Sequence, residues 1–191
     1  MRSSIQNIIS KSIISLLINE PFYSHLLSGV NRKITSDIST AAVGLSGSTI
    51  TLFINEDFFR NQLKKESSKV AVIKHEILHL VFKHLFRTDL FRYNTFLFNV
   101  AADIVVNQYI GKWELPDNAV TLKSFPDLGL APNETVEYYY DKIKELSDQY
   151  THESSKYPYS IKTLSELKNR HSHSDHSLWG KSSLEEIKSA E

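Results

Sequence analysis

The sequence predicts an α+β fold that is mainly helical, with a small β-sheet or hairpin beside a central helix. Three observations support this prediction. Apolar residues recur at helical spacing in several long segments, β-forming residues alternate in one region, and 41% of the 191 residues are hydrophobic. That hydrophobic content is enough to build a core, so we expect a folded chain.

The N-terminal segment is expected to be an amphipathic helix. Polar residues interrupt its apolar series and no small-residue cleavage site follows, so a signal peptide is not expected. No segment is long and apolar enough to span a bilayer, which favours a cytoplasmic protein without a membrane partner. A short second helical piece is expected after Pro21. The apolar positions of the first helix are Ile5, Ile8, Ile9, Ile13, Leu16 and Leu17.

The small sheet is expected in the next segment. β-forming residues alternate in TITLFI, and Gly44 and Gly47 precede it in a turn, which predicts two strands at about 38–44 and 48–54. The second strand is either an ordinary sheet strand or an edge strand that binds an extended peptide by β-augmentation. Asn55 then has the pattern of an N-cap, with two acidic residues in the first turn of a helix.

Helices are expected through most of the remaining domain, at about 56–65, 67–88, 95–110 and 134–147. Proline and glycine mark an irregular stretch before the last of them. Beyond residue 148 the composition changes to Ser, His, Lys and Asn, with few apolar residues. We therefore expect a domain over 1–147 and a polar, partly mobile extension over 148–191, which would begin a linker in a truncated piece of a longer protein.

Charge and cysteine content exclude several function classes. Lys and Arg together number 22, as do Asp and Glu, so the formal net charge is zero. That balance argues against a broad surface for nucleic acid or anionic membranes. The chain has no cysteine, so disulfides and thiolate metal sites are excluded. Any metal must therefore be bound by His, Asp, Glu or water.

One motif stands inside the helix expected at 67–88. HEILHL lies in the apolar run VAVIKHEILHLVFKHLF, where charged and imidazole side chains are costly unless something binds them. His75 and His79 are four residues apart, so both imidazoles project from one helix face. This is the H-E-x-x-H pattern, in which two imidazoles bind Zn²⁺ and the glutamate, here Glu76, handles the metal-bound water.

A chance match and a metal-free core are the competing interpretations of this motif. With eight His in the chain, the five letters alone give moderate support. The motif lies on a strongly apolar helix after a β-strand region, which is the setting of a zincin-type site. A metal-free core would leave two imidazoles and a carboxylate without partners. The sequence therefore favours a metal site.

Catalytic zinc normally has three protein ligands, and the third is expected from Asp103. Asn99, Asp103 and Asn107 are spaced by four and form one polar line on an otherwise apolar helix, where a buried carboxylate needs a cation. The alternative is that this line is a solvent face. Asn107 is expected to orient a ligand through its amide. Two His and one Asp also suit Mn²⁺, Fe²⁺ or Co²⁺.

His84 is the other candidate. It lies nine residues after His75, about 180° around a straight helix, so it faces away unless the helix breaks. The extended motif with a third His needs a turn-forming Gly, and VFK offers none. We expect His84 to support a ligand or to serve as an alternative one.

The segments KHEILHLVFKHLFR, FNVAADIVVNQYI and LPDNAV resemble the metallopeptidase domain found ahead of VWA-like domains in bacterial metal-dependent peptidases. That family has H-E-x-x-H, a His five residues on, an Arg three later, and a helix with A-x-D-x-x-x-N. FINEDFF, ETVEYYYDKI and DHSLW are looser matches, and the resemblance covers roughly residues 20–180. The matching residues are His75, Glu76, His79, His84, Arg87, Ala101, Asp103 and Asn107.

The resemblance implies a zincin-like fold and peptidase activity. It also implies partners: a peptide or protein substrate, a VWA-like domain that we expect beyond the truncation, and an ATPase of the AAA type. The resemblance supports the identity of the site residues more strongly than it supports the peptidase reaction.

The leading hypothesis is zinc-dependent hydrolysis of peptide bonds. His75, His79 and Asp103 would bind the metal, and Glu76 would act as general base and later donate a proton to the leaving amine. Candidates for stabilising the oxyanion are His84, Tyr93 and Tyr109. For each of them the alternative is an ordinary packing role in the core or at the surface.

Two other hypotheses remain. In one, the zinc site only ties helices 67–88 and 95–110 together in a non-catalytic adaptor module, in which Glu76 beside the metal would have no use. In the other, HSHSDH binds metal through His171, His173 and His176, although such a tract without a scaffold favours adventitious binding.

Overall fold

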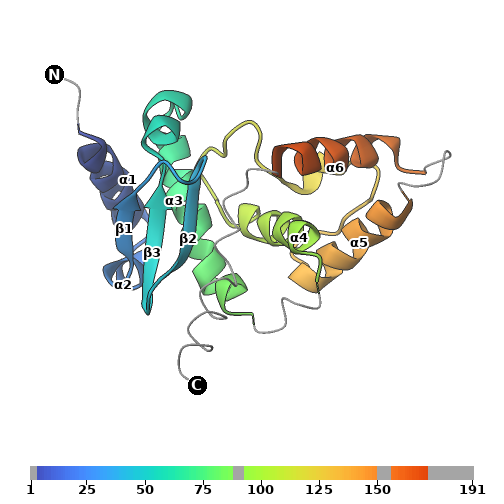
Figure 1. The fold of residues 1–191 in the computed structure, drawn as a ribbon, viewed down its shortest axis with the longest axis horizontal. Helices are drawn as coiled ribbons and strands as arrows, with labels where there is room; N and C mark the ends of the chain where they lie inside the picture. The colour runs from blue at the N-terminus through green and yellow to red at the C-terminus, as the bar shows by residue number, and fades with distance from the viewer. Residues whose placement is uncertain (1–3, 88–92, 150–155, 172–191) are drawn as a thin grey trace. The chain divides into compact units, whose positions relative to one another are not determined.

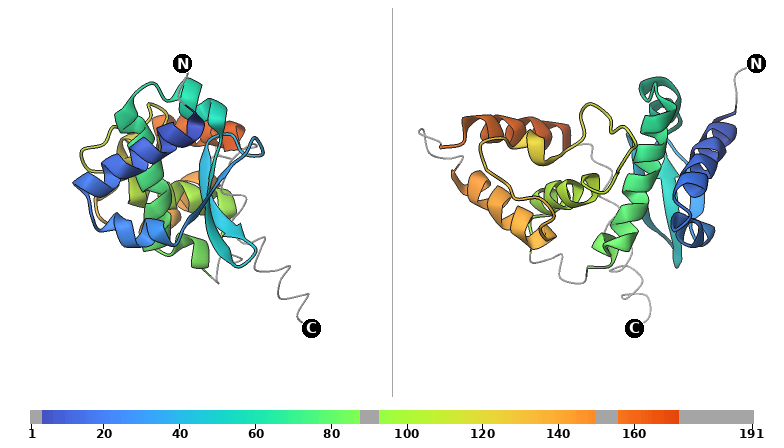
Figure 2. Two further views of the ribbon diagram at one scale, coloured as in Figure 1. Left: turned by 90° about the vertical axis from the view of Figure 1, so that its left-hand side faces the viewer. Right: turned by 180° about the vertical axis from the view of Figure 1, so that it is seen from behind.

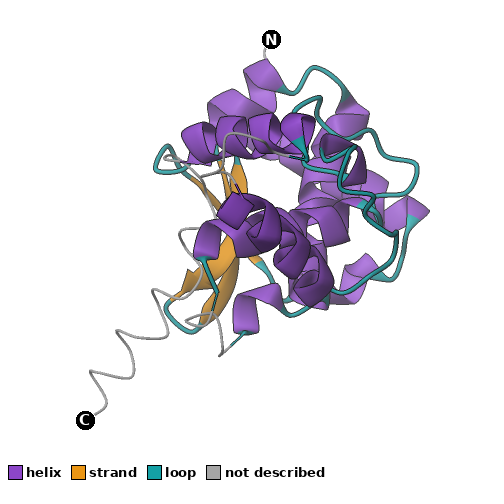
Figure 3. Ribbon diagram, turned by 90° about the vertical axis from the view of Figure 1, so that its right-hand side faces the viewer, coloured by secondary structure: helices purple, strands orange, loops and turns teal. Residues whose placement is uncertain are grey.

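The protein is mainly helical with one small β-sheet, as the sequence predicts (Figure 3). The computed structural model describes residues 4–87, 93–149 and 156–171. Its helices are α1 (Ile5–Asn19), α2 (Tyr23–Ser28), α3 (Glu66–Val81), α4 (Thr95–Asn107), α5 (Val136–Gln149) and α6 (Pro158–His171). Its strands are β1 (Asn31–Ile34), β2 (Ala41–Ser46) and β3 (Thr49–Ile54). Figure 1 labels them.

The described residues fall into two compact units. The first unit comprises residues 4–86 and 112–117, and so contains the sheet and α1 to α3. The second unit comprises the remaining described residues and contains α4 to α6. Helix α5 continues past the boundary expected at residue 147 and ends at Gln149, and it contacts α6 within the second unit.

The sheet has the order β1-β3-β2, with β1 parallel and β2 antiparallel to β3. A two-residue turn joins β2 to β3, and Gly47 adopts φ 60° at its first position, which a type II′ turn requires. Strand β1 has no signal in the sequence, because its four residues, NRKI, are all exposed and show no alternation of burial. The two edge strands are therefore β1 and β2. The suggestion that 48–54 forms an edge is wrong, because β3 is paired on both sides.

Helices α1 and α3 pack together on one side of the sheet (Figure 2, left). Ser4 caps α1, its Oγ accepting a hydrogen bond from the Asn7 N–H at 3.2 Å. The Ile9, Ile13 and Leu16 side chains are buried, which confirms the predicted amphipathic helix. Between β3 and α3 the helix expected at 56–65 is a short π-helical turn at Phe58–Gln62.

A cluster of polar side chains ties residues 112–117 to the first unit. Glu20, at the end of α1, accepts hydrogen bonds from Lys74 Nζ through Oε2 and from Trp113 Nε1 through Oε1, both at 2.6 Å. Lys74 is 3% exposed, so its charge is stabilised by this carboxylate. Ser67 Oγ accepts a hydrogen bond from the backbone N–H of Glu114 at 3.0 Å. The N-terminal half of α3 is thereby connected to both α1 and the 112–117 segment.

In the second unit α4 packs against α5. Asn94 caps α4, its Oδ1 accepting from the Leu97 N–H at 3.1 Å. The Arg87 guanidinium lies over the Phe98 ring, 5.6 Å from its centroid, and donates to Glu137 Oε1 on α5 at 2.6 Å. Burial raises the pKa of Glu137, but the bond from Arg87 and other favourable interactions outweigh this and hold the pKa below 4.5.

Helix α6 lies within the polar extension expected over 148–191. Ser160 is fully buried and Leu164 is 6% exposed, so this polar sequence has one apolar face in contact with the protein. Asp127 caps the helix by accepting the N–H groups of Tyr159 and Ser160 at 3.0 and 3.1 Å. Composition missed the helix because its buried stripe is narrow and its capping residue lies far away in the sequence.

Several expectations lie outside the described residues. They concern the rest of the extension expected to be partly mobile, the DHSLW motif, and His173 and His176. Among the helices that are described, none is long and apolar enough to cross a membrane.

Candidate metal centre

Helix α3 carries the H-E-x-x-H motif through the core of the first unit. The helix contacts α1 through one part of its surface and β2 through another. Its side chains are consequently buried over most of its length, including Glu76 at 3% exposure and His79 at 0%. The motif therefore lies in a protein interior, where polar groups need partners.

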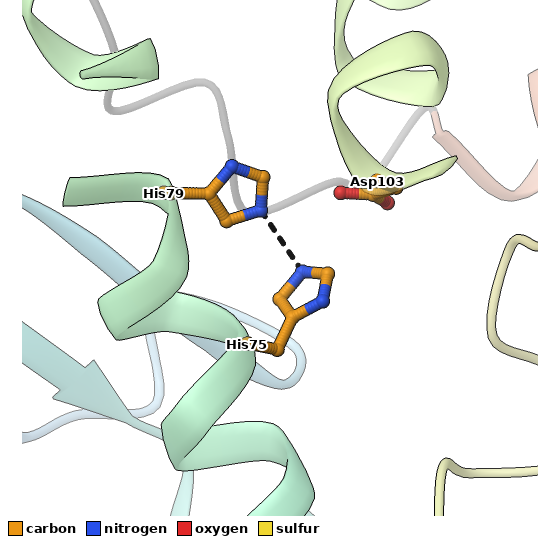
Figure 4. Close-up of side chains that lie close together, drawn as sticks. All are labelled: His75, His79 and Asp103. Atoms are coloured by element: carbon orange, nitrogen blue, oxygen red, sulfur yellow. Dashed lines mark hydrogen bonds between the residues drawn. The ribbon is translucent and has the colours of Figure 1, made fainter. Parts of the chain in front are cut away.

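The two motif histidines meet through their Nε2 atoms. The distance between His75 Nε2 and His79 Nε2 is 3.0 Å, and the ring planes are inclined at 73° (Figure 4). The predicted projection from one helix face is confirmed by this contact. Two imidazoles that direct the same ring nitrogen to one point are suited to bind a borderline divalent metal ion there. The donors present thus fit a metal.

His84 contacts the other nitrogen of His79. Helix α3 ends at Val81, seven residues before the predicted end at 88, and Lys83 adopts the left-handed conformation with φ 58°. This reversal places His84 in a 3₁₀ turn (His84–Phe86), with its Nδ1 3.0 Å from His79 Nδ1. The condition stated for His84, a break in the helix, is therefore met. Sequence reasoning could not foresee the break, because Lys rarely adopts positive φ.

Glu76 is held by the sheet. Its Oε2 accepts a hydrogen bond from the backbone N–H of Val43 at 3.0 Å, and its Oε1 lies 4.0 Å from His75 Nε2. Val43 is on the edge strand β2, and the N–H that binds Glu76 points away from β3. This hydrogen bond gives the buried carboxylate a partner and fixes its orientation. Val43 has no sequence signal, since any residue provides a backbone N–H.

The predicted polar line on α4 lies in the second unit. Asn99 and Asn107 are buried, at 2% and 8% exposure, and Asp103 is half-buried, so the line is not a solvent face. Asn107 Nδ2 donates to the Val120 carbonyl at 2.7 Å and so holds the loop after α4. Its role in orienting a ligand stays a prediction. Figure 4 draws the Asp103 side chain on α4.

The three oxyanion candidates have separate surroundings. His84 contacts His79, as described above. The Tyr93 hydroxyl accepts a hydrogen bond from Arg87 at 3.4 Å, and its ring packs edge-on against Tyr140 with centroids 4.7 Å apart. Tyr109 follows α4 and is 43% exposed. None of these contacts tests an oxyanion role.

The family to which the chain belongs is consistent with a metal site. The family described as a putative metallopeptidase domain matches residues 7–188. The chain belongs to this family. A metallopeptidase domain needs metal-binding side chains, and in this member His75 and His79 are brought together beside Glu76. No curated protein and no solved structure matches the chain significantly.

Proposed function

We propose that the protein is a zinc-dependent peptidase whose centre is built on α3. The observation that carries the proposal is the position of Glu76, a buried carboxylate anchored by Val43 and 4.0 Å from the ring nitrogen of His75. A carboxylate held beside two convergent imidazoles is the arrangement that metal-assisted hydrolysis needs. Membership of the metallopeptidase family supports the same reaction class.

The proposed ligands are the Nε2 atoms of His75 and His79 and the carboxylate of Asp103. Two histidines and this aspartate form a donor set that can hold one metal ion. The proposal requires the second unit to supply Asp103 to the histidines of the first. A zinc ion bound there would lower the pKa of a water molecule to about 7 and polarise the scissile carbonyl.

Glu76 performs the proton transfers in this proposal. One carboxylate oxygen remains bonded to the Val43 N–H, which fixes the orientation of the group. The other oxygen accepts the proton of the attacking water and later delivers it to the leaving amine. In this role Glu76 acts first as general base and then as general acid.

His84 positions His79. When the Nδ1–H of His79 donates to His84 Nδ1 across their 3.0 Å contact, the proton of His79 is confined to that side of the ring. The Nε2 lone pair of His79 is then available for the metal. A hydrogen bond of this type orients the ring and raises the basicity of the ligand.

Strand β2 is the proposed binding edge for an extended peptide. It is an edge strand, it contacts α3, and its outward N–H at Val43 already reaches Glu76. Alternation along the strand places the backbone groups of Leu45 on the same edge. A peptide added there would lie beside Glu76.

A non-catalytic module is the second candidate. The bond from Val43 to Glu76 favours it, because the bond gives the glutamate a structural use without any reaction. In that case the metal would only join α3 to α4. The VWA-like domain, the AAA-type ATPase and the cytoplasmic location expected from the sequence stay predictions.

Glu76→Gln separates the two candidates. The Gln side-chain carbonyl can still accept the Val43 N–H, so we expect the variant to fold and to bind metal as the wild type does. Without a base, hydrolysis should fall at least about 100-fold. Metal content by mass spectrometry and cleavage of a fluorogenic peptide library measure both effects. Undiminished turnover in the variant contradicts the mechanism, and zinc-loaded wild type that cleaves no peptide favours the non-catalytic module.

A further inference from the structure

The rings of Phe82 and His84 stack on each other directly after α3. Their centroids are 5.8 Å apart and their planes are inclined at 19°, so the two rings are nearly parallel. Residues two apart do not face each other on a helix. The left-handed conformation of Lys83 between them reverses the chain and brings both side chains to one side. The stacked pair is therefore a product of this turn.

The backbone that carries Phe82 is fixed to α3. The N–H of Phe82 donates to the Leu78 carbonyl at 2.9 Å, and the N–H of Lys83 donates to the Leu80 carbonyl at 3.0 Å. The Lys83 carbonyl accepts the N–H of Phe86 at 3.1 Å, which closes the 3₁₀ turn. Phe82 therefore presents its ring from a fixed position.

His84 is contacted both on a ring face and at a ring edge. Phe82 covers a face, because the two planes are nearly parallel. His79 contacts the edge through Nδ1, at 3.0 Å, with the two ring planes inclined at 60°. A hydrogen bond holds the direction of that nitrogen, and a stacked ring opposes rotation of the imidazole out of its plane. Because His84 is 2% exposed, these contacts are made away from solvent.

We propose that Phe82 is a positioning residue. It fixes the plane of the His84 ring and, through His84, the orientation and the tautomer of His79. The inference rests on the proposed function, in which the Nε2 lone pair of His79 binds the metal. A leucine would occupy similar space but has no flat face. The proposal therefore requires an aromatic ring at residue 82, and not simply an apolar side chain.

A double-mutant cycle on zinc affinity is the first test. Phe82→Leu should bind zinc about two- to tenfold more weakly, which is the effect of one aromatic contact. Phe82→Tyr keeps the flat ring and should bind zinc as the wild type does. In a His84→Ala background, Phe82→Leu should change the affinity by less than about twofold, because Phe82 acts only through His84. An equal loss with and without His84 would show that Phe82 only supports the fold, and would overturn the proposal.

Phe86→Leu is the matched control. Phe86 belongs to the same turn but is 46% exposed, so this variant should retain wild-type zinc affinity. Competition with a chromophoric chelator measures all the dissociation constants. A loss in Phe86→Leu as large as the loss in Phe82→Leu would mean that any change in the turn weakens zinc binding, and would overturn a specific role for Phe82.

The tautomer of His79 in the metal-free protein is the second test. Long-range proton–nitrogen NMR spectra at about pH 8.5, where histidine is ordinarily neutral, report which ring nitrogen carries the proton. The wild type and Phe82→Tyr should hold this proton on Nδ1, and Phe82→Leu should show a mixture of both tautomers. A wild-type proton on Nε2, or a single Nδ1 tautomer in Phe82→Leu, overturns the proposal. A residue that only supports the fold would not change the tautomer.

The outcomes separate this inference from the proposed function. Zinc binding that does not depend on Phe82 overturns the role of Phe82, while the metal centre stands. A wild-type protein that binds no zinc overturns the proposed function. In that case the His79 tautomer in metal-free Phe82→Leu still decides whether Phe82 orients the ring.

Discussion

At the scale of single residues, the orientation of His79 depends on Lys83. The left-handed conformation of Lys83, φ 58°, turns the chain after α3 so that His84 contacts His79. A non-glycine residue in this conformation is unfavourable by itself and persists where the surroundings hold it. Here the conformation of Lys83 places the His84 imidazole next to Nδ1 of His79, on the side of the ring opposite the nitrogen proposed to bind the metal.

His84→Ala should therefore weaken zinc binding without abolishing it. Loss of a partner of this type typically reduces metal affinity about 10- to 100-fold. His84→Asn should retain more of the affinity, because its Oδ1 can replace Nδ1 as the acceptor from His79. Competition with a chromophoric chelator measures the three dissociation constants. Equal affinity in the wild type and both variants would show that His84 has no part in positioning His79.

At the scale of elements, the sequence predicted those whose signal is local and periodic. The apolar spacing of α1, α4 and α5 and the alternation of β3 are visible in the letters. The end of α3 and the strand β1 are not, because a lysine at positive φ and four exposed residues carry no such pattern.

The candidate site divides in the same way. His75, Glu76 and His79 follow from their spacing in the sequence, because one helix turn brings them together. The contacts of Glu76 with Val43 and of His79 with His84 depend on how β2 and the turn after α3 pack, which no local pattern encodes.

The contact between α1 and α3 contains a buried ion pair whose loss should be costly. Glu20→Gln removes the carboxylate from Lys74, and we expect the free energy of unfolding to fall by about 2–3 kcal/mol. The double variant with Lys74→Met should recover most of this loss, since an apolar side chain needs no partner there. Urea unfolding measures both. The Lys74 side chain is only 4% exposed, so water contributes little to stabilising its charge. The contact with Glu20 therefore matters for stability.

The Lys65–Glu114 pair is the control for this prediction. Its two side chains are 64% and 50% exposed, so Glu114→Gln should change stability by less than about 1 kcal/mol. If Glu20→Gln has an effect as small as Glu114→Gln, the Lys74–Glu20 pair does not stabilise the contact between α1 and α3.

At the scale of the whole molecule, the proposed centre takes ligands from both compact units, His75 and His79 from the first and Asp103 from the second. Zinc would then bind the folded chain far better than the unfolded one, and its binding energy would add to stability. At a free zinc concentration of 100 times the dissociation constant, the gain should be about 2.7 kcal/mol. Asp103→Ala should lose both the bound zinc and this gain, while each unit keeps its own core.

Asn107→Ala is the comparison, since it alters the same face of α4 without removing a proposed ligand. Its stability should fall with and without metal alike, and one zinc per chain should remain bound. The decisive quantities are the zinc content by mass spectrometry and the shift in unfolding temperature on adding zinc. If Asp103→Ala keeps one zinc per chain and the full shift, the metal is bound within the first unit alone. The centre would then consist of α3 and its following turn, and the second unit would have to be assigned a different role.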